Sequence, residues 1–407
     1  MTDDRNLQVI SHFRLGGDLM ELNTDQKKAL VRFAKWYKDF NNPTKCVRRW
    51  FEISGAAGTG KTTLAKYLFA SVGINDKNVL FMAYVGKATM ALARNGLRAK
   101  TIHSSIYNVV MNRYDEDGVV KYRREFVLKD ALHYSIKAIV VDEGSMVPEN
   151  IAEDILSFNL PVIVLGDLNQ LPPVMGSPFF LRQPDAILKK IMRQAEESPI
   201  IRLSQDILHS KMFKLGDYDK YGKIKVLKDE DGLSVDFKEF DSIIVGKNKT
   251  REMYNKYIRE QVYGRFGDIQ VNDKLICRKN NWDYFTHDGI FLINGLVGRV
   301  VDIDLMDSTS QYLTIELLPD GYRDSFTQVR LDRALFKVPL TKKRYMGQAF
   351  TKYDVFEYAY AITCHLAQGS QYNNVYIKYE QLGDGDYCRR WLYTAVTRAI
   401  ERITLVV

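Results

Sequence analysis

Residues 55–62 read Gly55-Ala56-Ala57-Gly58-Thr59-Gly60-Lys61-Thr62, which is the pattern G-x-x-x-x-G-K-[ST] of a phosphate-binding loop. A strand-like apolar run at residues 50–54 precedes this loop, and helically spaced apolar residues follow it from residue 63. Glycines allow the backbone to wrap phosphate oxygens, and the free N–H groups at a helix start favour negative charge. We expect Lys61 to reach the β- and γ-phosphates and the Thr62 hydroxyl to ligate Mg²⁺. The loop therefore predicts a site for a nucleoside triphosphate.

The length, composition and net charge of the chain limit the kinds of protein that it can be. A chain of 407 residues is too long for one compact core, so about two to four domains are expected. With 46% hydrophobic and 27% charged residues, the composition is that of a soluble globular protein. The net charge of +8 fits a polyanionic partner such as nucleic acid.

The terminus and the cysteines indicate a cytoplasmic protein. The first residues lack the basic-then-apolar pattern of a signal peptide. No apolar run approaches the ~18 residues that a membrane helix needs, so no membrane partner is expected. The four cysteines are far apart and include no C-x-x-C pair, which argues against a zinc site or a disulfide framework and favours a reducing cytoplasm.

An acidic pair ends a second buried strand. The continuous apolar run at residues 136–141 is followed by Asp142 and Glu143. In a nucleotide site, Asp142 would hold the Mg²⁺ shell and Glu143 would polarise the attacking water. The alternative is an ordinary strand-terminating turn, but the phosphate-binding loop upstream favours the site. A third strand, at residues 161–165, leads to Gln170, whose side-chain amide could sense the γ-phosphate.

Strands that alternate with helices predict an α/β fold with parallel, doubly wound sheets and ligands at the carboxyl ends of the strands. The second half of the chain repeats this pattern without a phosphate-binding loop. Two segments depart from it. Asp115-Glu116-Asp117-Gly118, flanked by β-like runs, predicts a hairpin within residues 105–130. Short β-like runs between about residues 265 and 345 predict a small inserted β-barrel.

Gln26 and His103 each allow two interpretations. Gln26 enters a helix that Asn23 or Thr24 would cap, and its amide could read the edge of an adenine ring. A solvated glutamine in a first helical turn is the alternative. His103 follows Ile102 in an otherwise uninformative stretch, where a histidine is as often structural as functional.

Taken in order, these stretches resemble the motifs of superfamily 1 helicases, specifically the RecD-like branch, over nearly the whole chain. Gln26 resembles the family's adenine-reading glutamine. The remaining matches are motif I at residues 55–62, motif II at 142–146, motif III at 166–173, motif IV at Arg193-Gln194, motif V at 363–369 and motif VI at 396–399. Two positions depart from the family pattern. Tyr84-Val85 stands where Pro-Thr is usual, so a hydroxyl contact to the DNA backbone is missing, and Leu366 replaces a common lysine.

The resemblance implies two RecA-like P-loop domains with parallel sheets. It places a β-hairpin insertion, or pin, in the first domain and an SH3-like β-barrel insertion in the second. The implied boundaries are 1–104 and 131–185 for the first domain, 105–130 for the hairpin, 186–264 and 346–407 for the second domain, and 265–345 for the barrel.

The resemblance also implies a DNA-stimulated ATPase that translocates on single-stranded DNA, 5′ to 3′, and unwinds duplexes. ATP and Mg²⁺ are the implied cofactors. Catalysis is assigned to Lys61, Glu143, Gln170, Arg193 and Arg398, and the metal to Thr62 and Asp142. ATP is assigned to Gln26, Gly55, Ala56, Ala57, Gly58, Thr59, Gly60, Lys61, Thr62, Thr63, Gln368 and Gly369. Nucleic acid is assigned to Lys87, Thr89, Thr101, His103, Thr363 and His365.

The expected partners are single-stranded DNA and forked duplex DNA, together with a single-strand-binding protein or other replication and recombination proteins. The resemblance implies a monomer, and a bacteriophage origin would place it in the host cytoplasm. Three alternatives stay open: a translocase that strips bound proteins without unwinding, a P-loop kinase, and a nucleotide-gated DNA-binding module. RNA is not excluded as the strand, because backbone contacts of this kind tolerate a 2′-hydroxyl.

Overall fold

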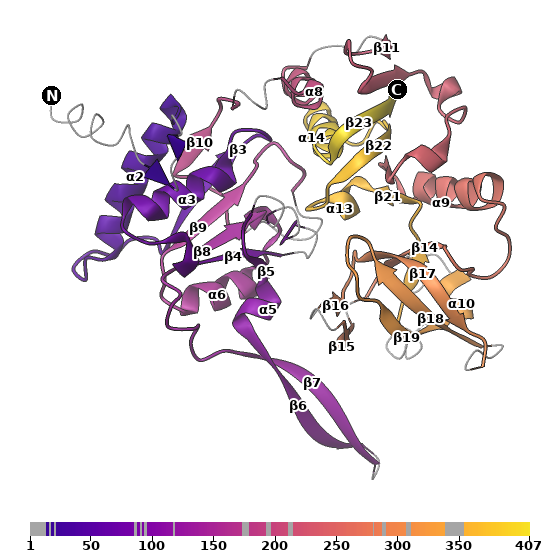
Figure 1. Ribbon diagram of the computed structural model, residues 1–407, viewed down its shortest axis with the longest axis horizontal. Coiled ribbons are helices and arrows are strands. Elements are labelled where there is room, and N and C mark those ends of the chain that lie inside the picture. The colour runs from indigo at the N-terminus through magenta and orange to yellow at the C-terminus, as the bar shows by residue number, and fades with distance from the viewer. Residues whose placement is uncertain are drawn as a thin grey trace.

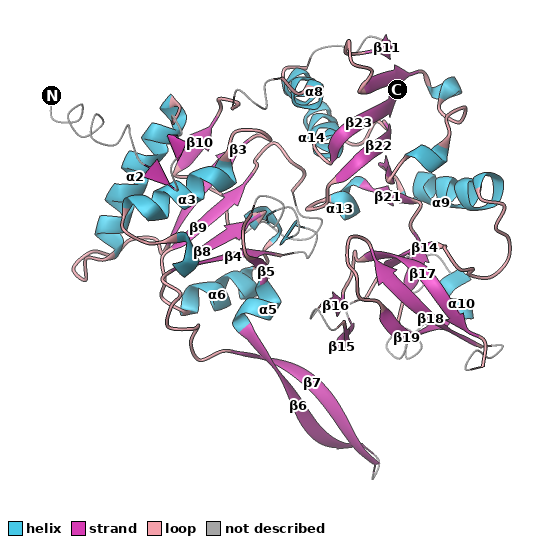
Figure 2. Cartoon of the chain, in the orientation of Figure 1, coloured by secondary structure: helices cyan, strands magenta, loops and turns pink. Residues whose placement is uncertain are grey.

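Two α/β units lie side by side in the computed structural model, with a long hairpin projecting from the first and a smaller β unit attached to the second (Figure 1). The structure describes residues 14–15, 18–19, 22–84, 88–89, 92, 96–116, 119–172, 179–192, 197–210, 215–279, 281–286, 290–306, 311–337 and 354–407. Figure 2 separates the two sheets, which have helices beside them, from the smaller unit, which is mostly strand. No helix within these ranges is both long and apolar enough to cross a bilayer.

The first unit is a six-stranded sheet of parallel strands in the order β10-β3-β9-β8-β4-β5. Its strands are β3 (Trp50–Gly55), β4 (Val79–Ala83), β5 (Ala99–Thr101), β8 (Ala138–Asp142), β9 (Val162–Gly166) and β10 (Ala186–Leu188). Its helices are α2 (Thr24–Phe40), α3 (Lys61–Ser71), α5 (Ile102–Ile106) and α6 (Glu149–Ser157), with 3-10 turns η1 (Asp76–Asn78) and η2 (Gly144–Met146). A two-stranded ladder, β1 (Arg14–Leu15) and β2 (Asp18–Leu19), precedes it.

Helices cover both faces of this sheet, which explains why its strands are continuous apolar runs. Alternate residues of β9 show the two faces. Ile163 and Leu165 lie in the core that α2 and α3 cover, whereas Val162 and Val164 lie in the core that α5 and α6 cover. All four side chains are fully buried, and each contributes about 1.5–3 kcal/mol of hydrophobic stabilisation. The carboxyl ends of the strands are thereby held in fixed positions.

The second unit is also a six-stranded sheet, in the order β11-β12-β23-β22-β13-β21, parallel except for β11. Its strands are β11 (Gly216–Asp217), β12 (Ile224–Leu227), β13 (Ser242–Val245), β21 (Ala361–Thr363), β22 (Tyr372–Lys378) and β23 (Ala399–Val406). Its helices are α8 (Pro199–Leu208), α9 (Asn248–Tyr257), α13 (Cys364–Ala367) and α14 (Gly385–Val396), with short turns η3 (Asp229–Asp231), η4 (Phe237–Glu239) and the π-helical η5 (Ile258–Val262). Two doubly wound parallel sheets are therefore present, as the alternation of strands and helices predicted.

The hairpin consists of β6 (Tyr107–Glu116) and β7 (Val119–Leu128). The register pairs Glu116 with Val119, and residues 117–118 between them lie outside the described ranges. In Figure 1 the two strands extend well beyond the sheet from which they arise. Such a two-stranded ribbon has no core of its own along its length, so its position depends on contacts at its base.

The inserted unit is an antiparallel five-stranded sheet in the order β19-β18-β17-β14-β20. Its elements are β14 (Lys274–Cys277), β17 (Val297–Asp304), β18 (Tyr312–Pro319), β19 (Phe326–Asp332), β20 (Phe356–Tyr358) and α10 (Arg333–Lys337), with a separate ladder of β15 (Asn281–Phe285) and β16 (Phe291–Leu292). A distinct apolar cluster fills it, including Leu275, Val300, Ile315 and Phe326.

The structure moves two of the boundaries that the sequence suggested. Strand β10 pairs with β3, so residues 186–188 belong to the first sheet and not to the second unit. Strand β20 pairs with β14, so the inserted sheet takes residues 356–358, beyond the expected end at 345. In both cases the strand has only three residues, and its partner is far away in sequence, so no local pattern could assign it.

Candidate functional site

The phosphate-binding loop joins β3 to α3 with the geometry that its glycines require. Gly58 and Gly60 have φ values of 79° and 77°, in the left-handed region that favours glycine. A Cβ at Gly55 would lie 2.6 Å from the Thr59 hydroxyl oxygen. Helix α3 begins at Lys61 without a side-chain cap, so the N–H groups of its first turn are available to a ligand.

This loop lines a cavity of about 430 Å³ that both α/β units form. The first unit contributes Ala57, Gly58, Thr59, Gly60, Lys61, Thr62, Thr63, Lys66, Ala88, Leu92, Leu97, Asp142, Glu143 and Gln170, and the second contributes Gly369, Gln371, Thr397 and Arg398. The structure therefore brings most of the predicted nucleotide and metal residues together. Arg193 and Lys87 lie outside the described residues.

Lys61 points back into its own loop. Its ammonium donates to the carbonyl of Gly55 at 2.6 Å and to that of Ala56 at 3.2 Å. These carbonyls hold the side chain at the rim of the cavity, where an incoming phosphate can replace them as acceptor. A charge-assisted bond to phosphate is roughly twice as strong as one to a neutral carbonyl, which favours that exchange.

The acidic pair lies at the end of β8, opposite the loop. Glu143 has a φ of 52°, an uncommon conformation for a residue with a side chain. The following Gly144 permits the turn, because a Cβ there would lie 2.2 Å from Val164 Cγ1. Burial first, and then the charge of Glu143, raise the pKa of Asp142 to about 6, while the charge of Lys61 opposes this shift. A cation would relieve the repulsion between the two carboxylates.

Asp142 and Thr62 fit a divalent cation by their chemistry. Both line the cavity, and a carboxylate and a hydroxyl are the oxygen donors that Mg²⁺ takes beside phosphate oxygens. Burial and the charge of Glu143 raise the pKa of Asp142, and the charge of a bound cation would oppose both effects. Within the described ranges no group of three or more His, Cys, Asp or Glu side chains forms a separate metal site.

Arg398 brings a positive charge from the second unit to the cavity. It is 4% exposed, and its guanidinium donates to the carbonyls of Thr394 and Ser370 and to the Thr397 hydroxyl. None of these acceptors is charged, and the described carboxylates form no ion pair with it. A buried guanidinium without a counter-ion is costly, so a bound anion at this position would be strongly favoured. Gln170, 9% exposed, lines the same cavity from the first unit.

Two glutamines assigned to the nucleotide lie behind the cavity wall. Gln26 is fully buried and completes a capping box with Asn23, while its amide nitrogen lies 3.4 Å from the Thr59 carbonyl and 3.3 Å from Met192 Sδ. Gln368 donates to the Leu171 carbonyl at 2.7 Å. Both therefore contact the loops that form the site, and neither is among the residues that line it.

The residues assigned to nucleic acid fall in two groups. In the first unit, Thr101 caps α5, and His103 lies in a ring cluster with Tyr107 and Phe126 at the base of the hairpin, where burial lowers its pKa. Thr89 precedes them in the chain and is half-buried, in the short described stretch 88–89. In the second unit, Thr363 ends β21 and is 8% exposed. Burial also lowers the pKa of His365, whose Nε2 lies 3.4 Å from the Tyr387 hydroxyl.

Two residues of α14 that the sequence did not single out, Tyr393 and Thr394, join the two units. The Tyr393 hydroxyl meets the Ala57 amide and the Asp167 carboxylate, and the Thr394 hydroxyl accepts from the Leu171 amide at 2.8 Å. Ala57 lies within motif I, Asp167 and Leu171 lie within motif III, and Tyr393 and Thr394 shortly precede motif VI. No sequence pattern indicates which of the aromatic residues in the last helix turns its hydroxyl toward the other unit.

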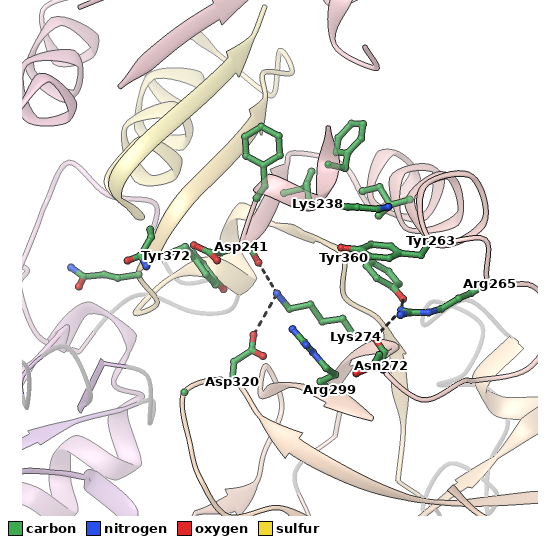
Figure 3. Close-up of a pocket in the computed structure, with 17 residues that line it drawn as sticks. Lys238, Asp241, Tyr263, Arg265, Asn272, Lys274, Arg299, Asp320, Tyr360 and Tyr372 are labelled. Carbon is green, nitrogen blue, oxygen red and sulfur yellow. Dashed lines mark hydrogen bonds and ion pairs between the residues drawn. The ribbon is translucent and has the colours of Figure 1, made fainter. Parts of the chain in front are cut away.

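A second cavity, of about 530 Å³, marks the joint between the second and inserted units. Figure 3 shows Lys274 reaching up between Asp241 and Asp320, and Arg265 beneath Tyr360. Lys274 donates to the Asp241 carbonyl at 2.6 Å, and Arg265 donates to the Tyr360 hydroxyl at 2.7 Å. None of the predicted site residues lines this cavity. The bond from Lys274, in β14, to Asp241 links the inserted sheet to the second unit.

Sequence comparisons match both α/β units to known families. The profile of the AAA domain family matches residues 21–229, just over half of the chain, and that of the UvrD-like helicase C-terminal domain matches residues 358–406. An uncharacterised protein of Methanocaldococcus jannaschii is 25% identical across 95% of this chain, which spans only 39% of that relative. The ATP-dependent DNA helicase Dda of Enterobacteria phage T4 is 23% identical, with 85% of this chain and 92% of Dda aligned. The crystal structure of Pif1 helicase from Candida albicans aligns with 95% of this chain and 94% of its own at a TM-score of 0.48 and 16% identity.

Proposed function

Because the chain belongs to the AAA domain family and, with it, to the superfamily 1 helicases, we propose that it is an ATP-dependent DNA helicase. In this proposal it hydrolyses ATP in the cavity between the two units, moves along single-stranded DNA and separates duplex strands. The family resemblance alone suggests that it moves 5′ to 3′. Helicase activity is a property of the relatives. For this chain, the geometry of the cavity between the two units is the physical support for the proposal.

One observation carries the proposal: Lys61 and Arg398 line the same cavity from different units. Phosphoryl transfer requires positioning and charge neutralisation more than covalent chemistry. Lys61 would bind the β- and γ-phosphates, and Arg398 would neutralise the charge that develops on the γ-phosphate. Since each cation is anchored in its own sheet, hydrolysis and phosphate release would weaken the attraction between the units.

The remaining cavity residues have complementary roles. Glu143 would accept the proton of the attacking water, and Gln170 would orient that water or the γ-phosphate. Thr62 and Asp142 would hold Mg²⁺, which would neutralise charge on the phosphate oxygens. The N–H groups at the start of α3 would receive the β-phosphate.

Movement of the two α/β units would be transmitted to a single strand of nucleic acid that both units hold. Thr89, Thr101 and His103 from the first unit, with Lys87, and Thr363 and His365 from the second, are the residues that we propose to contact it. The net charge of +8 supports binding through phosphates, which is sequence-tolerant and salt-sensitive. Alternate closing and opening of the cavity would then advance the strand.

The hairpin is proposed to separate the duplex, and the inserted unit, which we propose to be SH3-like, to brace it. A specific contact supports the brace: the rings of Phe126, in β7, and Phe291, in β16, are 5.5 Å apart with an interplanar angle of 70°. Edge-to-face aromatic pairs contribute about 0.5–1.5 kcal/mol beyond their buried area. The contact lies near the base of the hairpin, where a small displacement would move its far end most.

A translocase without unwinding activity is the second candidate, because it needs the same cavity and the same strand contacts. The projecting hairpin favours the helicase, since a translocase has no use for it. A P-loop kinase is disfavoured by the second sheet and by Arg398, which the chain contributes to its own phosphate site.

The deciding experiment measures strand separation on duplexes with a 5′ or a 3′ single-stranded tail, with ATP and Mg²⁺. The proposal expects ATP-dependent unwinding of the 5′-tailed substrate, ATP turnover that single-stranded DNA stimulates, and neither activity in Lys61→Ala. DNA-stimulated ATP turnover without unwinding of either duplex would reject the helicase and favour the translocase. Turnover that DNA does not affect would reject both.

A further inference from the structure

Tyr393 makes two direct polar contacts between the two α/β units. Its side chain is fully buried on α14 of the second unit. The hydroxyl oxygen accepts from the Ala57 amide of the phosphate-binding loop at 2.9 Å, and the same hydroxyl donates to Asp167 Oδ2 at 2.5 Å. Asp167 is 4% exposed and follows β9. One hydroxyl group therefore contacts two loops of the first unit.

The protonation of Tyr393 fixes the direction of these bonds. Burial first, and then the negative charge of Asp167, raise the pKa of the Tyr393 hydroxyl well above its ordinary value. The group thus stays protonated, so its single proton points to the carboxylate and a lone pair remains for the Ala57 N–H. A phenylalanine could fill the same volume and make neither bond.

The same turn of α14 holds Arg398. The Thr394 carbonyl accepts from Arg398 Nε at 3.1 Å, and the Thr394 hydroxyl accepts from the Leu171 amide of the first unit. Tyr393 and Thr394 are adjacent, so the segment that anchors the guanidinium is also the segment docked on the first unit. A shift of this helix end relative to Ala57 would carry Arg398 with it.

We propose that Tyr393 is a positioning residue for hydrolysis: by bridging Ala57 and Asp167, its hydroxyl sets the end of α14 at the distance from the phosphate-binding loop at which Arg398 reaches the γ-phosphate. This inference rests on the proposed function. Tyr393 takes no part in bond making, and it acts through Arg398. Through the Ala57 bond, a change in the loop on phosphate release would also displace the end of α14.

If Tyr393 only stabilised the fold, removal of its hydroxyl would lower stability without a specific effect on kcat. Tyr376 is the matched control for this alternative. Tyr376 is also fully buried, and its hydroxyl also makes two hydrogen bonds, to the Gly232 carbonyl at 2.9 Å and with the Tyr254 hydroxyl at 3.0 Å. All three of these residues belong to the second unit. Removing either hydroxyl should cost similar stability, but only the loss at Tyr393 alters the relation between the units.

The test compares Tyr393→Phe, Tyr376→Phe, Arg398→Ala and the double variant Tyr393→Phe/Arg398→Ala in the full chain. We measure thermal unfolding and the kcat and KM of DNA-stimulated ATP turnover. We expect kcat to fall roughly 10- to 100-fold in Tyr393→Phe, with KM changed less than about threefold, because a small misplacement of a catalytic charge has this effect. Tyr376→Phe should retain kcat within about twofold. In the Arg398→Ala background, Tyr393→Phe should cause no further loss.

Two results would overturn the inference. One is a normal kcat in Tyr393→Phe. The other is a double variant whose fold-loss in kcat equals the product of the fold-losses of the two single variants. If Tyr393→Phe unfolds at a lower temperature than the control, Asp167→Ala removes the acceptor of the Tyr393 hydroxyl from the first unit and should reproduce the fall in kcat. A wild-type chain that does not hydrolyse ATP would reject the proposed function and this inference with it. Wild-type turnover with an unaffected Tyr393→Phe rejects the inference alone.

Discussion

Lys61 and Arg398 line one cavity from two different sheets, the first at the start of α3 and the second just beyond the end of α14. Neither cation forms an ion pair with a carboxylate among the described residues, although the charge of Lys61 acts on Asp142. A polyanion in the cavity would be attracted by a cation of each unit, and the predictions below test the parts of the cavity separately.

Lys61→Ala should abolish ATP hydrolysis while leaving the fold intact. The ammonium donates only to carbonyls of its own loop, so its loss removes phosphate binding and little stability. We expect kcat/KM for ATP to fall at least ~10³-fold. Lys35→Ala, at an exposed position of α2, is the control and should match the wild type. Full turnover by Lys61→Ala would reject the assignment of the loop.

Arg398→Ala should lower kcat by roughly 10³-fold, the lower end of the range for arginines that neutralise a transferred phosphate. Binding of ADP, which lacks the γ-phosphate, should change much less, as measured by calorimetry. Arg402→Ala, four residues along and exposed on β23, is the matched control. Equal losses of ADP affinity and kcat would show that Arg398 supports the nucleotide site in general and does not act on the γ-phosphate.

Asp142→Asn should stabilise the protein while inactivating it. The folded-state pKa of Asp142, about 6, lies above its ordinary value of 3.8. The folded protein thus keeps a proton that the unfolded chain has released, so the cost of the ionised carboxylate grows as pH rises from 4 to 6 and is complete above 6. We expect a gain of about 1–2 kcal/mol at pH 7.5 in the presence of EDTA, and a smaller gain at pH 4.5.

The control for this prediction is Glu153→Gln, at an exposed position of α6. Its stability should follow that of the wild type at both pH values. A gain in Asp142→Asn that is equal at pH 4.5 and 7.5 would contradict the raised pKa.

Gly144→Ala should destabilise the first unit by about 1–3 kcal/mol in chemical unfolding, because the added methyl group would overlap Val164 Cγ1. Adding Val164→Ala should recover part of this loss by making room. At Gly385, the first residue of α14, a Cβ would meet no atom within 4 Å, so Gly385→Ala serves as the control and should be neutral or stabilising. No recovery in the double variant would mean that Gly144 is needed for some other reason.

Phe291→Ala should uncouple unwinding from ATP turnover. The variant removes the ring that contacts Phe126 at the base of the hairpin and leaves the nucleotide cavity untouched. We expect DNA-stimulated kcat to stay within about twofold while the unwinding rate falls several-fold, as expected from loss of an aromatic pair worth about 1 kcal/mol. Phe266→Ala, 59% exposed before the inserted sheet, is the control. Parallel loss of both activities would argue against a bracing contact.

The sequence by itself determined the parts of this protein that are encoded locally. Buried parallel strands are continuous apolar runs, and the loop at residues 55–62 carries its glycines where the backbone turns left-handed, so the α/β class, the loop and the acidic pair could be predicted. The two β-like runs of the hairpin pair with each other, from Tyr107 with Leu128 to Glu116 with Val119. Each of these features depends on neighbours in the chain.

Only the tertiary structure decided the features that depend on distant residues. The three-residue strands β10 and β20 are assigned by the strands that they pair with, and Gln26 lies behind the loop because α2 packs there. The raised pKa of Asp142 requires both burial and Glu143. The bridge from Tyr393 to Ala57 and Asp167 exists only because α14 docks on the first sheet. A hydrogen bond depends on distance and direction in space, and a linear pattern contains neither for residues far apart in the chain.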